Sequence, residues 1–166
     1  MVLMVQKEVA ERIVGTKSEA KRNFSRFTLP RSGAGSDTSQ NFSLPRSFAT
    51  TKESLLSISV KTYGWPEIIR YVPAGYFSPT PKVDSAVIKI SNISKNFFQD
   101  IDEKKFFETV KKGFSQKRKM LINNLKAGFP STSDVEGKVV ACNIGEKARA
   151  ENISLEQWKC LTFLMR

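Results

Sequence analysis

The chain has 166 residues, of which 40% are hydrophobic, so it is long enough for one ordinary domain or parts of two with a real core. Lysine and arginine number 27 against 16 aspartate and glutamate residues, which gives a formal net charge of +11. That excess favours a polyanionic partner, because neutralised phosphates release condensed counterions, although it can also serve solubility alone. The sequence contains no histidine, which excludes histidine-based triads, histidine general bases and histidine-ligated metal sites.

Cys142 and Cys160 are the two cysteines, and their spacing matches no CxxC motif. We expect both to be isolated core residues in a reducing, cytoplasmic setting, because nothing upstream resembles a secretory signal. No apolar run approaches the roughly 20 residues that a membrane-spanning helix needs. The expected partners therefore include neither a membrane nor a metal.

The first residues predict a strand followed by an amphipathic helix. Val2 to Val5 is aliphatic and largely β-branched, and Lys7 to Val14 places apolar residues at helical spacing. A buried strand needs a neighbour at each edge, and no residue before Met1 supplies one. We therefore expect an element of the fold to be missing from this chain.

Residues 16 to 53 differ in composition from the rest of the chain. Serine, threonine, glycine, lysine and arginine dominate, and a short repeat occurs at Phe27 to Ser32 and again at Phe42 to Ser47. Too little apolar surface is present to offset a backbone ordering cost of roughly 1 to 2 kcal/mol per residue. We expect a flexible, basic insertion, which is either a solvated loop or a segment whose Phe and Arg residues contact RNA.

Three elements are expected between residues 55 and 90. Leu55 to Lys61 alternates apolar and small polar residues and predicts a strand with one covered face. Pro66 is expected to begin a short helix that turns Ile68, Ile69 and Tyr71 inward. A proline-punctuated loop then ends at Lys82, and Val83 to Ile90 predicts another strand.

The residues after Asn92 predict helices. Apolar residues recur at steps of three and four with a break near Gly113 to Gln116, and lysines and arginines are interleaved with them. Ser154 followed by Gln157 forms a capping-box pattern for a last helix. Its inward side is expected to carry Leu155, Trp158, Leu161 and Leu164.

Four segments resemble the bacterial KsgA-type small-subunit ribosomal RNA adenine dimethyltransferases and their eukaryotic relatives, in the same order. They read QKEVAER at 6–12, FSPTPKVDSAV at 77–87, FSQKRKMLINNL at 114–125 and KARAENISLEQ at 147–157. The resemblance implies an α/β fold: a truncated Rossmann-like class I methyltransferase domain, represented by its last three strands, followed by a small all-α helical domain. The three strands are expected at Val2 to Val5, Leu55 to Lys61 and Val83 to Ile90. The domains would span 1–92, including the insertion, and 93–166.

The resemblance also implies site residues. Phe77 matches the phenylalanine that stacks on the target adenine, although a side chain that merely fills a core is the alternative. Pro79 and Pro81 would stiffen this substrate-binding loop, because each proline fixes its own φ and restricts the residue before it. Lys82 is expected to contact an RNA phosphate, and Asp84 to brace the loop by accepting backbone N–H bonds. The remaining expected substrate-binding residues form a basic surface that faces RNA or is simply solvated: Gln116, Lys117, Arg118 and Lys119.

The implied function is S-adenosylmethionine-dependent N6,N6-dimethylation of adenines in small-subunit ribosomal RNA or a pre-ribosomal particle. In this family the cofactor-binding motifs precede the position that matches Met1, so no cofactor-binding residue is expected in this chain. We therefore expect an inactive fragment that lacks an amino-terminal half. The rival hypothesis is a non-catalytic RNA-binding or ribosome-assembly factor derived from the same family.

Overall fold

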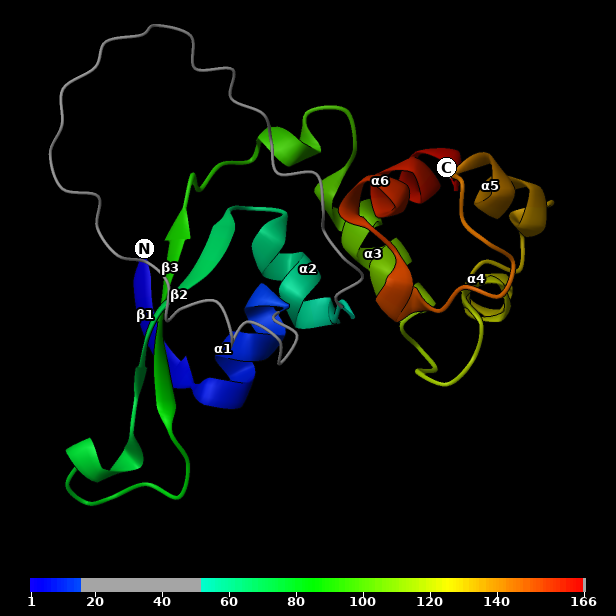
Figure 1. Cartoon of the computed structure of the whole chain (residues 1–166). Helices are drawn as coiled ribbons and strands as arrows, with labels where there is room; N and C mark the ends of the chain where they lie inside the picture. Colours follow the sequence, from blue (N-terminus) through cyan, green and yellow to red (C-terminus); the bar gives the residue numbers. More distant parts are fainter. Residues whose placement is uncertain (16–51, 166) are drawn as a thin grey trace, which may run out of the picture.

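The computed structural model describes residues 1–15 and 52–165. The predicted insertion at 16 to 53 lies outside the described residues except for its last two positions. A small sheet with two helices against it occupies one side of the molecule, and a group of short helices occupies the other (Figure 1). The chain therefore has a sheet part and a helical part, joined after the last strand.

The sheet part contains three strands. β1 (Val2–Gln6) and β2 (Trp65–Val72) both pair antiparallel with the central strand β3 (Ser85–Ser91), in the order β1-β3-β2. The prediction of a first and a last strand is confirmed within one or two residues. Within the described chain, β1 and β2 each have one edge without a strand partner.

Two helices cover one face of this sheet. α1 (Lys7–Val14) buries Ala10 and Ile13 against Ala86 and Ile88 of β3, and α2 (Leu55–Lys61) packs beside α1. The buried residues of β3 alternate along the strand, as expected for a strand with one covered face. Gly15 ends α1 in the left-handed conformation, with φ of 78°, where a glycine carries no Cβ penalty.

The strand predicted at Leu55–Lys61 is wrong, because these residues form α2. Ser54 caps the helix: its side chain accepts from the backbone N–H of Ser57, and the Ser57 side chain accepts from Ser54 N. Inside the helix, the Ser59 hydroxyl donates to the carbonyl of Leu55 at 2.8 Å. Serine hydroxyls thus find helical partners, and an alternating pattern over seven residues does not separate a helix from a strand.

The short helix predicted after Pro66 is also wrong, because the segment is the strand β2. β-branched Ile68, Ile69 and Val72 favour extended backbone, and a proline is tolerated in a strand at the edge of a sheet. A bulge between Ile68 and Arg70 shifts the register. Ile69 is 53% exposed, whereas it was expected to face inward.

The helical part is built from α3 (Glu103–Gly113), α4 (Leu121–Gly128), α5 (Val135–Ala141) and α6 (Leu155–Leu164), with short 3-10 turns η4 (Asn96–Phe98) and η5 (Ala150–Asn152). The predicted break after Gly113 separates α3 from α4. The Ser154–Gln157 capping box at the start of α6 is confirmed, and Trp158 and Leu161 are completely buried. The largest apolar core of the described residues lies here, and Ile58 of α2 belongs to it.

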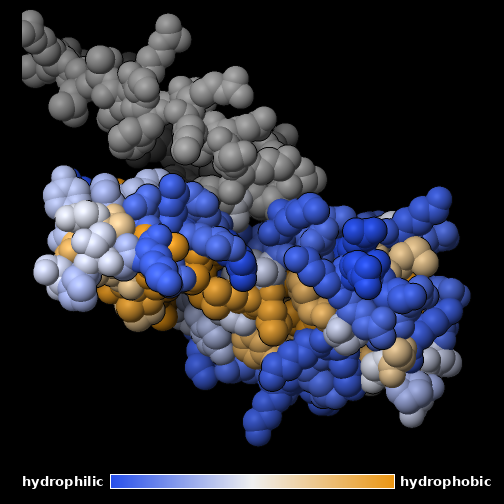
Figure 2. All heavy atoms as spheres, turned by 90° about the horizontal axis from the view of Figure 1, so that it is seen from below, coloured by the Kyte–Doolittle hydropathy of each residue, from blue (hydrophilic) through white to orange (hydrophobic). Residues whose placement is uncertain are grey.

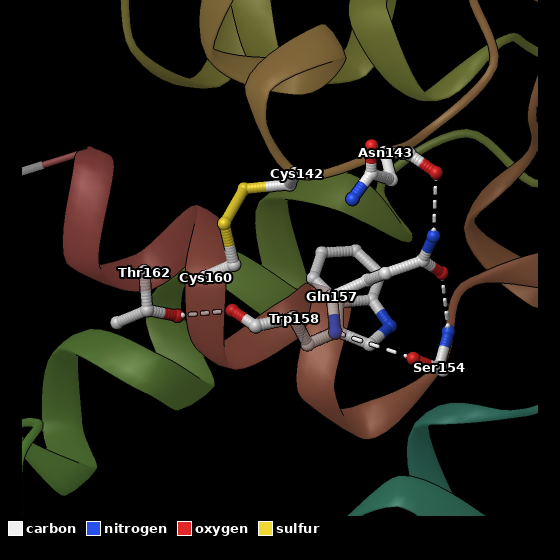
Figure 3. Close-up of a disulfide and its surroundings, with 7 residues drawn as sticks. All are labelled: Cys142, Asn143, Ser154, Gln157, Trp158, Cys160 and Thr162. Carbon is white, nitrogen blue, oxygen red and sulfur yellow. Dashed lines mark hydrogen bonds between the residues drawn. A yellow bond between two sulfur atoms is a disulfide. The ribbon is translucent and has the colours of Figure 1, made fainter.

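Cys142 and Cys160 form a disulfide that joins the end of α5 to α6, with their Cα atoms 5.8 Å apart (Figure 3). The expectation of two isolated cysteines is therefore wrong. They are 18 residues apart in the sequence and become neighbours when α5 folds back on α6, which no local pattern reveals. A disulfide that closes a loop of this length stabilises a domain by about 3 kcal/mol. Such bonds are typical of oxidising compartments, so the cysteines give no support to a reducing one.

Two sets of contacts join the sheet part to the helical part. Tyr63, after α2, donates a hydrogen bond from its hydroxyl to Glu103 Oε1 at 2.5 Å, and its ring contacts Phe98 and Phe107. Before α2, Lys52 pairs with Glu151 at 3.0 Å, and the backbone N–H of Glu53 donates to the carbonyl of Glu151 at 2.7 Å. The end of the predicted insertion therefore makes ordered contacts.

The Tyr63–Glu103 bond changes the ionisation of both partners. Burial first, and then the hydrogen bond and charge of Glu103, raise the pKa of Tyr63 from 10.0 to about 12. The hydrogen bond from Tyr63, followed by the one from Lys95, lowers the pKa of Glu103. A raised tyrosine pKa means that the folded protein holds the phenolic proton at a pH where the unfolded chain has lost it.

We predict that this bond stabilises the protein fully between neutral pH and pH 10, and that the stabilisation is lost as the pH rises from 10 toward 12. Tyr63→Phe should lower stability at neutral pH by about 1 kcal/mol, the usual net contribution of one hydrogen bond. The difference in Tm between the natural chain and the variant should then shrink across that pH window. A difference that stays constant up to pH 12 would show that Tyr63 contributes packing alone.

Candidate nucleic-acid interface

The connection between β2 and β3, residues 73–84, projects beyond the foot of the sheet (Figure 1). It opens with the 3-10 turn η3 (Ala74–Tyr76), after which Phe77 lies in extended backbone. The Phe77 side chain is partly buried, yet it belongs to neither of the two apolar cores. Its place on a projecting loop therefore suits a contact with a ligand better than the filling of a core.

The other residues expected to contact substrate on this loop are exposed. Pro79, Pro81 and Lys82 all lie on the surface, after the turn that carries Phe77. The Thr80 hydroxyl donates to the carbonyl of Phe77 at 3.3 Å, which fixes the backbone on either side of Pro79. The loop thus presents an aromatic ring, two prolines and a lysine within six residues.

Asp84 braces this loop, as the sequence suggested. Its Oδ1 accepts a hydrogen bond from the backbone N–H of Ala74 at 3.1 Å, which closes the loop ten residues from its start. Lys7 reaches the same residue twice: its backbone N–H donates to Asp84 O at 3.0 Å, and its Nζ lies 3.9 Å from Oδ2. The loop is therefore tied to the start of α1.

Nearby, burial and then the Glu11 carboxylate raise the pKa of Tyr71.

A hollow of about 350 Å³ lies where these segments meet. The chain passes from β1 into α1 on one side of it and enters β3 on the other. Its lining includes Lys82 but not Phe77, so the ring lies outside this hollow. The lining residues are Gln6, Lys7, Glu8, Lys82, Val83 and Asp84. The sequence patterns did not predict that Gln6, Lys7 and Glu8 line this hollow, although these residues begin the QKEVAER segment that resembles the family.

Tyr76 is a second residue that sequence reasoning missed. Its side chain is 81% exposed, directly before Phe77. An exposed tyrosine on a projecting loop offers a flat ring and a hydroxyl to a partner. Its position beside the recognised phenylalanine was the available signal.

Gln116, Lys117, Arg118 and Lys119 lie in the connection between α3 and α4 rather than on a helix, and all four are exposed. The Lys119 N–H donates to the carbonyl of Gln116 at 3.1 Å, which closes a turn. None of the ion pairs between described residues includes the three basic side chains. Their charges are therefore available to a polyanion. We call residues 114–120 the basic loop.

Other basic residues of the helical part have structural contacts. Lys112 pairs with Glu108 at 2.6 Å, and its Nζ lies 3.8 Å from the centroid of the Phe129 ring. Lys126 pairs with Glu136 at 2.7 Å. These two lysines are paired with acidic side chains, unlike the three basic residues of the basic loop.

The β2–β3 loop and the basic loop project to the same side of the molecule. In Figure 1 both extend downward, the first from the sheet and the second, in yellow-green, from the helical part. Figure 2 shows the molecule from that side: hydrophilic residues cover most of the helical part, and hydrophobic residues gather toward the middle and the sheet part. A single extended ligand could contact both loops.

The glycines of the described residues are spread over different segments. A cradle for S-adenosylmethionine needs glycines clustered on one loop, so that the backbone can approach the cofactor. Here Gly64 packs against Ile90, Gly113 against Trp158 and Gly128 against Lys112, each in a different segment. We therefore assign no cofactor contact to this part of the chain.

Residues 1–15 and 52–165 contain no group of three or more aspartate, glutamate or cysteine side chains that could hold a metal ion. None of their helices has the length and apolar character needed to cross a membrane.

The sequence matches known proteins over nearly its whole length. "Ribosomal RNA small subunit methyltransferase A" of Dehalococcoides mccartyi is 32% identical over 162 residues, which cover 97% of this chain and 44% of the relative. The protein of the same name from Hydrogenovibrio crunogenus is 39% identical over 109 residues, which cover 66% of this chain and 39% of the relative. The chain thus spans less than half the length of these relatives.

Solved structures agree in fold. The crystal structure of the 23S rRNA methyltransferase ErmE superposes with a TM-score of 0.58 at 17% identity, covering 99% of this chain and 53% of that one. A dimethyladenosine transferase from Plasmodium falciparum gives 0.58 at 21% identity, covering 96% and 54%. The sequence model described as "Ribosomal RNA adenine dimethylase" matches residues 43–164. This chain therefore belongs to the ribosomal RNA adenine dimethylase family.

Proposed function

We propose that this chain is the RNA-docking, carboxy-terminal part of an S-adenosylmethionine-dependent adenine N6,N6-dimethyltransferase that acts on small-subunit ribosomal RNA. The observation that carries the proposal is the pair of loops on one side of the molecule, one with Phe77 and the other with three basic residues that form no ion pair with another described residue. Family membership and relatives named for the small subunit support the choice of RNA. The sheet part would be the end of a Rossmann-like domain, and the helical part a separate docking domain.

In this proposal the β2–β3 loop holds the target base. An adenine inside a helix must leave its stack before its exocyclic amine can react, and an aromatic side chain compensates by stacking on its face. Phe77 is the candidate ring, and Tyr76 beside it is available to a neighbouring base. When bound elsewhere in such an enzyme, S-adenosylmethionine supplies the methyl group. The residues of this chain orient the base.

The basic loop would bind the RNA backbone. Lysine and arginine contacts to phosphates position a protein on its RNA without reading the sequence. RNA recognition depends largely on shape and on bases in single-stranded regions, so a base-holding loop and a phosphate-binding loop have complementary roles. Lys82, on the first loop and at the hollow, would add a phosphate contact near the base.

An amino-terminal half, either preceding this segment or supplied by another chain, is part of the proposal. β1 forms an edge of the described sheet, and Val2 and Met4 on it are 63% and 57% exposed. An apolar edge strand of this kind favours pairing with another strand. The lengths of the relatives leave room for such a half. We also propose a cytoplasmic location.

A second candidate is a non-catalytic RNA-binding or assembly factor. It is favoured by one observation: both loops are held in place by residues of this chain, through Asp84 in one case and the α3–α4 turn in the other. RNA binding by this surface therefore needs no cofactor. Transfer of labelled methyl groups to small-subunit RNA by the longest natural form of the protein distinguishes the two functions.

The charge of the basic loop should set the affinity for RNA. Replacing Lys117, Arg118 and Lys119 together by alanine should weaken binding to small-subunit RNA fragments. The slope of log K against log salt should fall by about 2 to 3, as expected for three lost phosphate contacts. Fluorescence anisotropy at several salt concentrations measures both quantities.

The matched control removes three lysines elsewhere: Lys89, Lys104 and Lys105, each to alanine. All three are exposed, and the net charge falls by the same amount. The control should change the slope less than the loop variant does. Equal changes would mean that binding follows net charge and not the basic loop.

Phe77 should be needed for catalysis but not for folding. In a protein completed by fusion to a family amino-terminal half, Phe77→Ala should reduce methyl transfer or RNA affinity roughly 5- to 150-fold, because stacking on a base contributes about 1 to 3 kcal/mol. Phe77→Tyr and Phe77→Trp should retain much of the activity. If Phe77→Ala instead lowers the free energy of unfolding by about 3 to 5 kcal/mol, the ring is a packing residue and the base-holding role is wrong.

A further inference from the structure

Asn124, on α4, is a buried polar residue beneath the basic loop. The residue is only 3% exposed, and the side-chain amide nitrogen Nδ2 donates two hydrogen bonds. One goes to the carbonyl of Gly113 at 2.6 Å and the other to the carbonyl of Gln116 at 3.1 Å. A buried amide group is stable only when its donors are satisfied, so this side chain is bound to the loop.

The two carbonyls that Asn124 binds have distinct positions. Gly113 is the last residue of α3, and the carbonyls of a final helical turn have no partner within the helix. The carbonyl of Gln116 also accepts from Lys119 N–H, the bond that closes the turn of the basic loop. A single amide group therefore joins the end of a helix to the turn that carries the basic residues.

The two ends of the basic loop are also anchored. The Phe114 ring stacks on the Trp158 ring, with centroids 5.8 Å apart, and the N–H of Leu121 donates to Ala148 O at 2.8 Å. Between these anchors, the side chains from Ser115 to Met120 are exposed. Asn124 reaches the loop between its anchors, where the backbone could otherwise move.

We propose that Asn124 is a positioning residue for RNA binding: it holds the turn so that Lys117, Arg118 and Lys119 present their charges in one fixed arrangement. The proposal rests on the proposed function, since it assumes that the basic loop contacts RNA. A loop fixed in its binding conformation loses less entropy when the ligand binds. Asn124 touches no ligand and acts through the backbone of the loop.

The direct test is Asn124→Ala in the full chain, measured with the same small-subunit RNA fragments. Loss of the fixed turn should weaken RNA binding by about 2- to 10-fold, the range expected when one or two loop groups must be ordered on binding. Hydrogen exchange of the amides of residues 115–120 should become faster, while exchange in α6 stays unchanged. Asn124→Gln, which keeps an amide donor, should recover part of the affinity.

Asn123→Ala is the matched control, because Asn123 is the same residue type, one position earlier, and exposed. It should change neither affinity nor exchange. Ile13→Val trims a buried side chain in the core of the sheet part, which includes no residue of the helical part, and should cost about 0.5 to 1.5 kcal/mol of stability. It controls for a general loss of stability and should leave RNA affinity unchanged.

Combining Asn124→Ala with the triple alanine variant of the basic loop separates positioning from simple stability. If Asn124 acts through the loop charges, their removal should reduce affinity less in the Asn124→Ala background than in the natural one. Additive losses would overturn the proposal. The proposal would also be overturned if Asn124→Ala bound RNA as tightly as the natural chain although the amides of its basic loop exchanged faster.

Failure of the proposed function gives a different result. In that case the triple alanine variant and the natural chain bind RNA equally well, and the result is the same whether or not Asn124 is replaced. If Asn124→Ala does not fold, one glycine inserted between Arg118 and Lys119 loosens the turn without changing the core. The insertion should weaken RNA binding to a similar extent, and unchanged binding would overturn the proposal.

Discussion

The contact between Tyr63 and the start of α3 fixes how the sheet part and the helical part are placed relative to each other. The hydroxyl of Tyr63 donates to Glu103, its ring lies against Phe98 and Phe107, and its carbonyl accepts from Ser94 N–H at 2.8 Å. One residue thus contacts three segments of the helical part. Because the β2–β3 loop belongs to one part and the basic loop to the other, their common orientation depends on this junction.

The start of α2 strengthens the same junction. Lys52 pairs with Glu151 at 3.0 Å, and the backbone N–H of Glu53 donates to the carbonyl of Glu151 at 2.7 Å. The carboxylate of Glu53 in turn bonds Ser57 and Lys61. Lys61 and Glu53 are only 11% and 14% exposed, so loss of either would leave an uncompensated charge in the segment whose backbone contacts Glu151. A rigid junction is what an interface made of two separate loops requires.

Sequence patterns predicted those elements whose signals are local and unambiguous. β1, α1, α3 and α6 have clear periodicity or a capping box, and the family-like segments led to Phe77 and to the loop that carries it. The residues of α2 were predicted to form a strand, because seven alternating residues fit either period. Those of β2 were predicted to begin a helix, because Pro66 begins helices as readily as it occupies an edge strand. The disulfide, the hollow beside Lys7 and the bonds of Asn124 depend on contacts between distant segments, which no local pattern contains.

We propose that one face of this chain, formed by the β2–β3 loop and the basic loop, binds small-subunit ribosomal RNA. Ultraviolet crosslinking of the chain to that RNA, with the crosslinked peptides identified by mass spectrometry, tests it most directly. Crosslinks are expected in residues 73–84 and in residues 114–120, at Tyr76 or Phe77 in the first loop. Crosslinks confined to other surfaces, with both loops free of them, would contradict the proposal.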